Sequence, residues 1–140
     1  MTRRQLRKQK HNMHDLPVYK AAYDCYKECR FRFRTVTKDC KATAHEVLRN
    51  LLEIMVDIEL VYWQVEPRER LAETYRLVLK TLVILRAMHD AGELSTQHFC
   101  VISKYSADLS KNMGNWNVYY NNKTNMEESG EENRQIAVDS

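Results

Sequence analysis

Apolar residues recur every three or four positions in four long segments of this chain, at about residues 15–37, 42–63, 66–91 and 95–120. That spacing places the apolar side chains of each segment on one face of an α-helix, which has 3.6 residues per turn. Short links between the segments favour successive helices that run side by side in opposite directions. The pattern predicts an all-α protein, an antiparallel up-and-down four-helix bundle, with neither strand alternation nor an internal repeat.

Each predicted helix has one face that we assign to the bundle core. The first helix contributes Tyr19, Ala22, Tyr23, Tyr26, Cys29 and Phe33. The second contributes Leu48, Leu51, Leu52, Met55, Ile58 and Tyr62. The third contributes Leu71, Tyr75, Val78, Leu82, Leu85 and His89. The fourth contributes Phe99, Ile102, Ser106, Leu109, Met113 and Trp116.

The ends of the predicted helices carry residues that favour starting or stopping a helix. Asp15 is suited to cap the first helix, with Pro17 in its first turn. Pro67 begins the third helix, and Gly92 fits the left-handed residue that follows its end. Ser95 is placed to cap the fourth helix.

The second segment is too apolar for a helix that buries a single stripe. Ten of the thirteen residues from 51 to 63 are apolar, whereas a surface helix shows three or four apolar positions per two turns. Once the core positions are assigned, Ile54, Val61 and Trp63 are left for contact with a partner subunit. This surplus predicts self-association.

Charge is distributed unevenly along the chain, although the net charge is only +3. Residues 1–50 hold thirteen Lys and Arg against five Asp and Glu, a difference of +8. Residues 124–140 hold one Arg against five acids, a difference of −4. We therefore expect a basic flexible arm at residues 1–14, the bundle at residues 15–120 and an acidic disordered tail at residues 121–140.

Composition narrows the class of protein further. The chain has only 3 Gly and 2 Pro, which favours a few long helices. No apolar run reaches the length of a membrane span, and the basic start lacks the apolar segment of a secretory signal. These features predict a cytoplasmic protein. The four cysteines lack the spacing of a zinc site or a disulfide scaffold, so we expect reduced, buried thiols.

The sequence shows no pattern typical of an enzyme. Di-iron bundle proteins use Glu-x-x-His motifs, which are absent, and His45, His89 and His98 are scattered. There is no phosphate-binding glycine loop, and no serine or cysteine lies in a nucleophile motif. The expectation is a protein without catalytic activity, metal or cofactor.

Basic residues on the predicted helices point to a polyanionic partner. Lys20, Lys27, Arg34 and Lys38 fall in one line if the first helix continues past residue 37. The arm extends this row with Arg3, Arg4, Arg7, Lys8 and Lys10. Arg76 and Lys80 on the third helix form a second, smaller patch. Aromatic residues interleaved with these cations are few, so we expect electrostatic binding of nucleic acid with strong salt dependence.

Three motifs stand in a fixed order along the chain. Residues 15–20 read DLPVYK, the segment after Leu82 contains Arg86, Asp90, Gly92, Leu94 and Ser95, and residues 111–116 read KNMGNW. Over about residues 15–118 the chain therefore resembles a bacterial family of four-helix bundles. That family includes the proteins of ribosomal RNA intervening sequences and the accessory variability determinants of diversity-generating retroelements.

The resemblance implies a ring-like homopentamer with a basic surface. For the retroelement branch it also implies binding to the reverse transcriptase and template RNA, and support of error-prone cDNA synthesis. It places Arg86, Asp90, Gly114 and Trp116 at family positions concerned with packing and assembly. Asn115 stands where the family often has a second glycine, and both chain ends lie outside the shared region.

Two other interpretations remain open from the sequence. One is a protein of a ribosomal RNA intervening sequence, without a role in a retroelement. The other is a purely structural homo-oligomer or scaffold that does not bind nucleic acid. The basic row and arm favour the nucleic-acid interpretation, because a polyanion binds through several simultaneous contacts.

Overall fold

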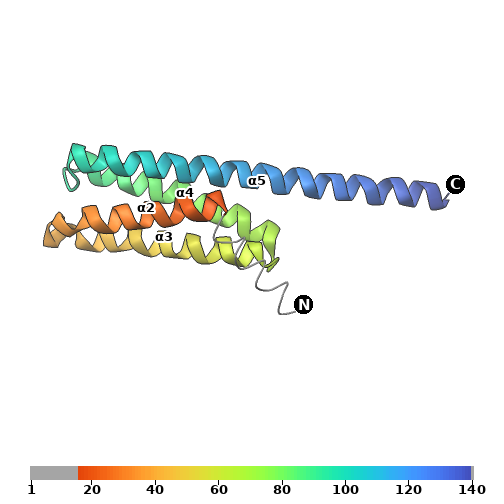
Figure 1. Cartoon of the computed structure of the whole chain (residues 1–140), viewed down its shortest axis with the longest axis horizontal. Helices are drawn as coiled ribbons and strands as arrows, with labels where there is room; N and C mark the ends of the chain where they lie inside the picture. Colours follow the sequence, from red (N-terminus) through yellow and green to blue (C-terminus); the bar gives the residue numbers. More distant parts are fainter. Residues whose placement is uncertain (1–15, 140) are drawn as a thin grey trace.

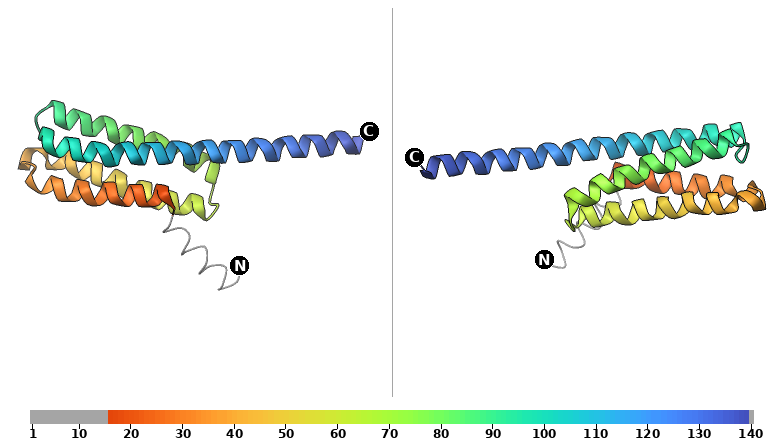
Figure 2. Two further views of the ribbon diagram at one scale, coloured as in Figure 1. Left: turned by 45° about the horizontal axis from the view of Figure 1, so that its top comes forward. Right: turned by 180° about the vertical axis from the view of Figure 1, so that it is seen from behind.

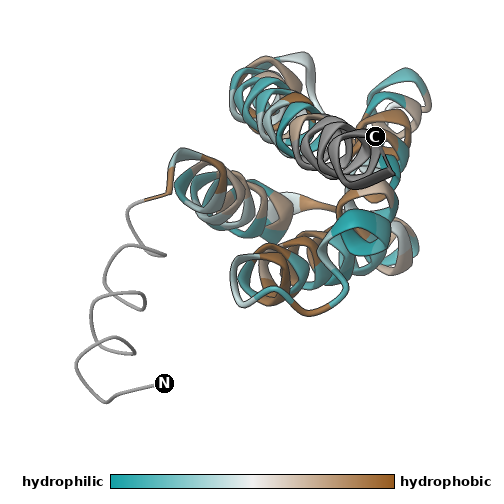
Figure 3. Cartoon of the chain, turned by 90° about the vertical axis from the view of Figure 1, so that its right-hand side faces the viewer, coloured by the Kyte–Doolittle hydropathy of each residue, from teal (hydrophilic) through white to brown (hydrophobic). Residues whose placement is uncertain are grey.

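The computed structural model describes residues 16–139, with side chains described for residues 16–123 and for Met126. The described chain consists of helices: α2 (Pro17–Arg32), η1 (Phe33–Thr35), η2 (Lys38–Cys40), α3 (Lys41–Tyr62), α4 (Pro67–Asp90) and α5 (Thr96–Asp139). The four α-helices lie side by side (Figure 1) and surround a common axis when viewed along the bundle (Figure 3). The predicted all-α four-helix bundle is confirmed.

Neighbouring helices follow the order of the chain around the bundle. α2 packs against α3 and α5, and α4 also packs against α3 and α5, so α2 and α4 lie diagonally opposite each other. Short connections reverse the chain between successive helices (Figure 2). As a result, the outer faces of α2 and α4 point away from each other.

The helix ends follow the predicted local chemistry. Pro17 is the first residue of α2, and Pro67 is the first residue of α4. Gly92 has a φ of 76°, the left-handed conformation expected after a helix end. The Ser95 hydroxyl accepts a hydrogen bond from the His98 backbone N–H at 3.2 Å, which confirms the predicted cap. The cap predicted at Asp15 lies outside the described residues.

The core is built from stripes that differ from the predicted faces in three helices. α2 buries Val18, Ala21, Ala22, Cys25 and Cys29. α3 buries Ala44, Val47, Asn50, Leu51, Ile54, Ile58 and Val61. α4 buries Leu71, Thr74, Val78, Thr81, Leu85 and Met88. α5 buries Ile102, Ser106, Leu109 and Met113, as predicted.

The assignment of Ile54 and Val61 to a subunit interface is wrong. Both side chains are 0% exposed in the core of the single chain, whereas Leu52, predicted to be buried, is 44% exposed. Apolar residues fill ten of the thirteen positions from 51 to 63, so helical spacing alone did not single out the buried arc. Close packing instead selects side chains whose volumes fit between the facing helices. Trp63 is half-buried at the end of α3, with its ring edge-on to Tyr62 at 5.8 Å.

The predicted buried face of α2 is also wrong in part, because close packing selects small side chains there. Alanine and cysteine side chains occupy the buried stripe, and Tyr23, predicted to be in the core, is 43% exposed. Tyr19 and Tyr26 pack at the edge of the core. A tyrosine at the edge can bury its ring and keep its hydroxyl near water. Small side chains are therefore left to fill the centre of the α2 interface.

The buried stripe of α4 differs from the predicted one because it includes two threonines. Thr74 and Thr81 are 1% and 2% exposed, although neither was among the predicted core residues. Their hydroxyls donate to the backbone carbonyls of Arg70 at 2.6 Å and Leu77 at 2.7 Å. A buried hydroxyl that is hydrogen-bonded within its own helix can occupy a core position at low cost.

The structure continues α5 as a helix through Asp139, where the sequence analysis expected a disordered tail from residue 121. This part of α5 projects beyond the other three helices (Figure 1). Its composition cannot build a core, but adding residues to an existing helix costs far less than starting one. Across the described residues, no helix combines the length and apolar character needed to cross a membrane.

The four cysteines differ in how far their side chains are exposed to solvent. Cys25 and Cys29 are buried and one helical turn apart in α2, Cys40 is half-buried, and Cys100 is exposed. The expectation of buried thiols is therefore wrong for Cys100. A hydrogen bond with the Cys25 thiol, together with burial, raises the pKa of the Cys29 thiol above its ordinary value.

We predict that a thiol-specific alkylating reagent modifies Cys100 first in the native protein. Cys25 and Cys29 should react only after unfolding, because both thiols are buried and the reagent cannot reach them. Mass spectrometry after a short exposure, with and without denaturant, measures this difference, and C100S should remove the fast reaction. Native labelling of Cys29 as rapid as that of Cys100 would contradict the structure.

We also predict opposite sensitivities for two neighbouring apolar residues of α3. Ile54→Ala should lower the free energy of unfolding by about 2–5 kcal/mol, because it leaves a cavity in the core. Leu52→Ala should lower it by about 1 kcal/mol or less, because the side chain is already in contact with water. Chemical denaturation of the two variants measures both values. Equal losses would contradict the assignment of the core face.

Candidate nucleic-acid interface

The predicted basic row lies on α2 and on the segment after it. Lys20 and Lys27 are exposed on α2, and Arg34 is exposed in η1. The row does not continue as one helix to Lys38, because α2 ends at Arg32 and Val36 adopts an extended conformation. Lys38 is exposed in η2, beyond this break. The arm residues Arg3, Arg4, Arg7, Lys8 and Lys10 lie outside the described residues.

The second predicted patch is separate from the first. Arg76 and Lys80 are exposed on α4, which lies diagonally across the bundle from α2. The structure therefore does not join these two cations to the row on α2. Arg76 and Lys80 thus carry positive charge on a part of the surface that the row on α2 does not reach.

Carboxylates neutralise part of the positive charge of α2. The Lys27 ammonium lies 3.8 Å from the Asp24 carboxylate. The Arg32 guanidinium donates to the Glu28 carboxylate at 2.8 Å and contacts the His98 ring nitrogen at 3.2 Å. By contrast, no carboxylate among the described residues forms an ion pair with Arg30, Arg34 or Lys41.

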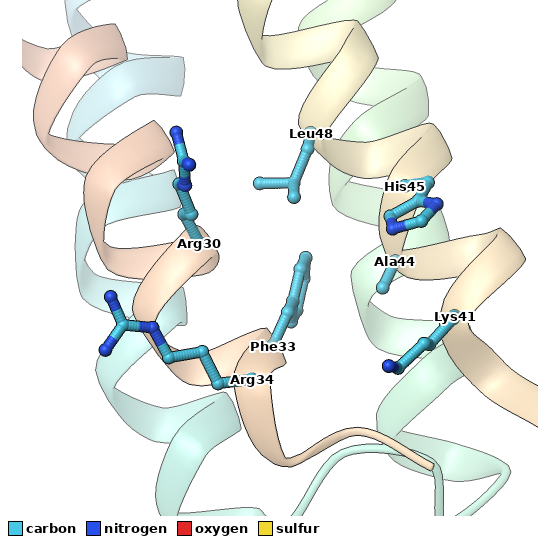
Figure 4. Close-up of a pocket in the computed structure, with 7 residues that line it drawn as sticks. All are labelled: Arg30, Phe33, Arg34, Lys41, Ala44, His45 and Leu48. Carbon is cyan, nitrogen blue, oxygen red and sulfur yellow. The ribbon is translucent and has the colours of Figure 1, made fainter. Parts of the chain in front are cut away.

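The chain reversal between α2 and α3 gathers cationic side chains around a hollow of about 200 Å³. Arg30 and Arg34 line it from the end of α2 and from η1, and Lys41 and His45 line it from the start of α3 (Figure 4). The ring of Phe33 lies between the two sides. Ala44 and Leu48 complete the lining. We call this the α2–α3 hollow.

The α2–α3 hollow has the chemistry of an anion site. Its seven lining residues, all within the described chain, include no Asp or Glu. Arg30 and Arg34 present planar guanidinium groups that can hold two phosphate oxygens at once, and Lys41 adds a point charge. His45 adds ring nitrogens that can donate a hydrogen bond. The hollow therefore suits a phosphate group.

Sequence reasoning missed Arg30 and Lys41 and gave His45 little weight. Arg30 does not lie in the line of Lys20 and Lys27, and Lys41 was assigned to a link. A signal was present in residues 30–34, which read RFRFR, with cations and aromatic rings in alternation. In this segment, aromatic residues alternate with cations more closely than the sequence analysis expected for the basic row.

Two exposed aromatic rings lie beside cations of the row. Phe31 is 55% exposed, with the Arg32 and Arg34 guanidinium carbons 5.4 Å and 5.5 Å from its ring centroid. Tyr23 is 43% exposed, with the Lys27 ammonium 4.7 Å from its ring centroid. Both separations are within the range of cation–π interactions.

Exposed apolar side chains form two further surfaces on different helices. Leu52 (44% exposed) and Val56 (56%) lie one turn apart on α3. Leu48, one turn before Leu52, lines the hollow with α2, so this surface lies on the α2 side of α3. Burial and, to a lesser degree, the Glu59 carboxylate raise the pKa of the Tyr19 hydroxyl on α2.

The other apolar surface contains Leu79 (42% exposed) and Val83 (68%), one turn apart on α4. Arg86, seven residues after Leu79 and thus on the same side of α4, lines a second hollow with Phe99 and Ser103 of α5. This surface therefore lies on the α5 side of α4. The α3 and α4 surfaces do not overlap.

The residues implied by the family resemblance differ in their surroundings. Arg86 is exposed, and the exposed Asp90 carboxylate lies 3.3 Å from the His89 ring nitrogen. Gly114 faces the Tyr75 ring, which a Cβ atom on residue 114 would meet at 3.5 Å. Trp116 packs against the core cluster. Gly114 and Trp116 thus take part in packing within the chain.

The described residues show no grouping of three or more His, Cys, Asp or Glu side chains that could hold a metal ion. Searches of protein-family models, curated proteins and solved structures give no match to this chain.

Proposed function

We propose that this chain is a non-enzymatic accessory protein of a diversity-generating retroelement that binds template RNA through the α2–α3 hollow and the basic row. The observation that carries the RNA-binding part is the cluster of Arg30, Arg34 and Lys41 around one hollow, without an ion-pairing carboxylate among the described residues. The retroelement setting, including a reverse-transcriptase partner, a cDNA product and action in the cytoplasm, follows from the family resemblance.

Phosphate binding at the hollow has a simple physical basis. Like charges held close together repel one another, and a bound phosphate replaces this repulsion with attraction. Binding also releases the counterions condensed on the nucleic acid, so affinity falls steeply as salt rises. Such contacts position a nucleic acid without reading its sequence. The proposed role is therefore to hold RNA near a polymerase, with little sequence preference.

We further propose that the protein forms a closed ring of identical subunits. The apolar surfaces of α3 and α4 are on different sides of the bundle, so one copy can place its α3 surface on the α4 surface of the next. A contact between two different surfaces is heterologous, and it generates a ring when the rotation closes. A ring repeats the α2–α3 hollow in every subunit, which multiplies phosphate contacts along one RNA. The resemblance favours five subunits.

If RNA binds at the α2–α3 hollow, its affinity should depend on the three cations there. The triple variant Arg30→Gln, Arg34→Gln, Lys41→Gln should bind a generic RNA at least tenfold more weakly at low salt. The plot of log affinity against log salt should lose about two units of slope, because each phosphate contact contributes about 0.7 for a single strand. Fluorescence anisotropy at several salt concentrations measures both quantities.

The control for charge is Arg76→Gln with Lys80→Gln, which removes two cations from α4, one fewer than the triple variant removes. Its affinity and salt slope should stay close to those of the wild type, because α4 lies across the bundle from the hollow. Equal losses in the two variants would indicate a diffuse effect of net charge. No RNA binding by the wild type at low salt would reject RNA binding and support the purely structural oligomer.

The proposed ring should depend on contact between the α3 surface of one subunit and the α4 surface of the next. Variants with Leu52→Glu and Val56→Glu, or with Leu79→Glu and Val83→Glu, should each elute as single subunits, because a charge on either surface blocks the contact. An equimolar mixture should form a heterodimer and nothing larger, since one intact surface of each kind remains. Light scattering coupled to gel filtration measures these masses.

The control for assembly is Val65→Glu, a change at an apolar residue that is 42% exposed and belongs to neither surface. It should assemble as the wild type does. A mixture of the two double variants that stays monomeric would contradict a heterologous contact. A wild-type protein that is monomeric at micromolar concentration would contradict assembly altogether.

A further inference from the structure

The exposed ring of Phe31 is not explained by the fold. It is 55% exposed on α2, although burial of a phenylalanine side chain is favourable by about 1.5–3 kcal/mol. Two residues later, at the start of η1, Phe33 is buried at 6% exposure. Phe31 lies beside two guanidinium groups, and aromatic residues and arginine are both enriched at binding surfaces.

Arg34 connects this ring to the α2–α3 hollow. Its guanidinium carbon lies 5.5 Å from the Phe31 ring centroid, and the same side chain lines the hollow. The base and the phosphate of one nucleotide are joined by a single ribose. A base placed on Phe31 therefore brings its own phosphate, or the adjacent one, towards Arg34 and the hollow.

Tyr23 repeats this arrangement earlier on the same helix. Its ring is exposed and carries the Lys27 ammonium at 4.7 Å. Tyr23 and Phe31 are eight residues apart, about 12 Å along the axis of α2. Lys20 and Lys27 are seven residues apart and so lie on one side of α2, and Arg34 follows in η1 beside the Phe31 ring. Rings and cations thus alternate along one path.

We propose that the outer face of α2 is a binding site for single-stranded nucleic acid, in which unpaired bases stack on Phe31 and Tyr23 and the α2–α3 hollow holds a phosphate. This inference rests on the proposed RNA binding and specifies its substrate. Every base has a flat face that can stack on an aromatic ring, so such a site tolerates any sequence. A paired duplex keeps its bases in the stack and offers only phosphates, so it gains nothing from the rings.

The test compares single-stranded and duplex RNA of the same sequence by fluorescence anisotropy. The wild type should prefer the single strand. Phe31→Ala should weaken single-strand binding about tenfold, in line with alanine substitution at other base-stacking sites. It should leave duplex binding unchanged. Tyr23→Ala should have an effect in the same direction, and a single-stranded DNA of the same sequence shows whether the ribose hydroxyl contributes.

Conservative variants separate stacking from simple apolar contact. Phe31→Trp should retain single-strand affinity, whereas Phe31→Leu should lose as much as Phe31→Ala. The matched control is Tyr119→Ala, which removes an exposed ring (61%) from α5. Residue 119 lies about 30 Å along α5 from His98, the residue that contacts Arg32. Its loss should not change either affinity.

The outcomes distinguish this inference from the proposed function. Equal affinity of the wild type for single strand and duplex, or equal losses for both in Phe31→Ala, would overturn stacking and leave phosphate binding intact. Retention of single-strand affinity in Phe31→Leu would also overturn it. Absence of binding to either RNA would instead reject the proposed function, and this inference with it. Unfolding midpoints should match the wild type, because the side chain is exposed.

Discussion

Each helix of this bundle must place a side chain in the shared core at every third or fourth residue, and the space there admits only certain volumes. In α2 the centre is filled by small side chains such as Ala22, Cys25 and Cys29. Larger rings, among them Tyr23, lie outside it. Close packing therefore excludes from the interior the aromatic rings that are proposed to bind nucleic acid at the surface.

The position at which α2 ends determines how the cations are arranged on the surface. If the helix had continued through Lys38, its cations would have formed a long, thin line. It ends at Arg32 instead, and the chain turns back through Val36 into α3. The turn brings Lys41 opposite Arg34 across one hollow. Two helices thus supply the charge that a single helix face would have spread out, and a phosphate can meet several cations at once.

Local features of the structure were predictable, and the rotation of most helices was not. The starts at Pro17 and Pro67, the cap at Ser95 and the left-handed Gly92 follow from residue types and their immediate neighbours. The stripe of α5 was also predicted, because its apolar residues occur in a single arc. α3 offers several apolar arcs, and the arc that contains Ile54 was not the one chosen from the sequence.

The sequence by itself determined the number of α-helices, the starts of α2, α4 and α5 and the excess of positive charge in the first part of the chain, because these depend on residues close together along the chain. Only the tertiary structure decided which arc of α2, α3 and α4 is buried, since that depends on the volumes that the other helices bring to the core. It also decided that Arg30, Arg34, Lys41 and His45 line one hollow, because their arrangement across a chain reversal depends on where the first helix stops and how the next one packs.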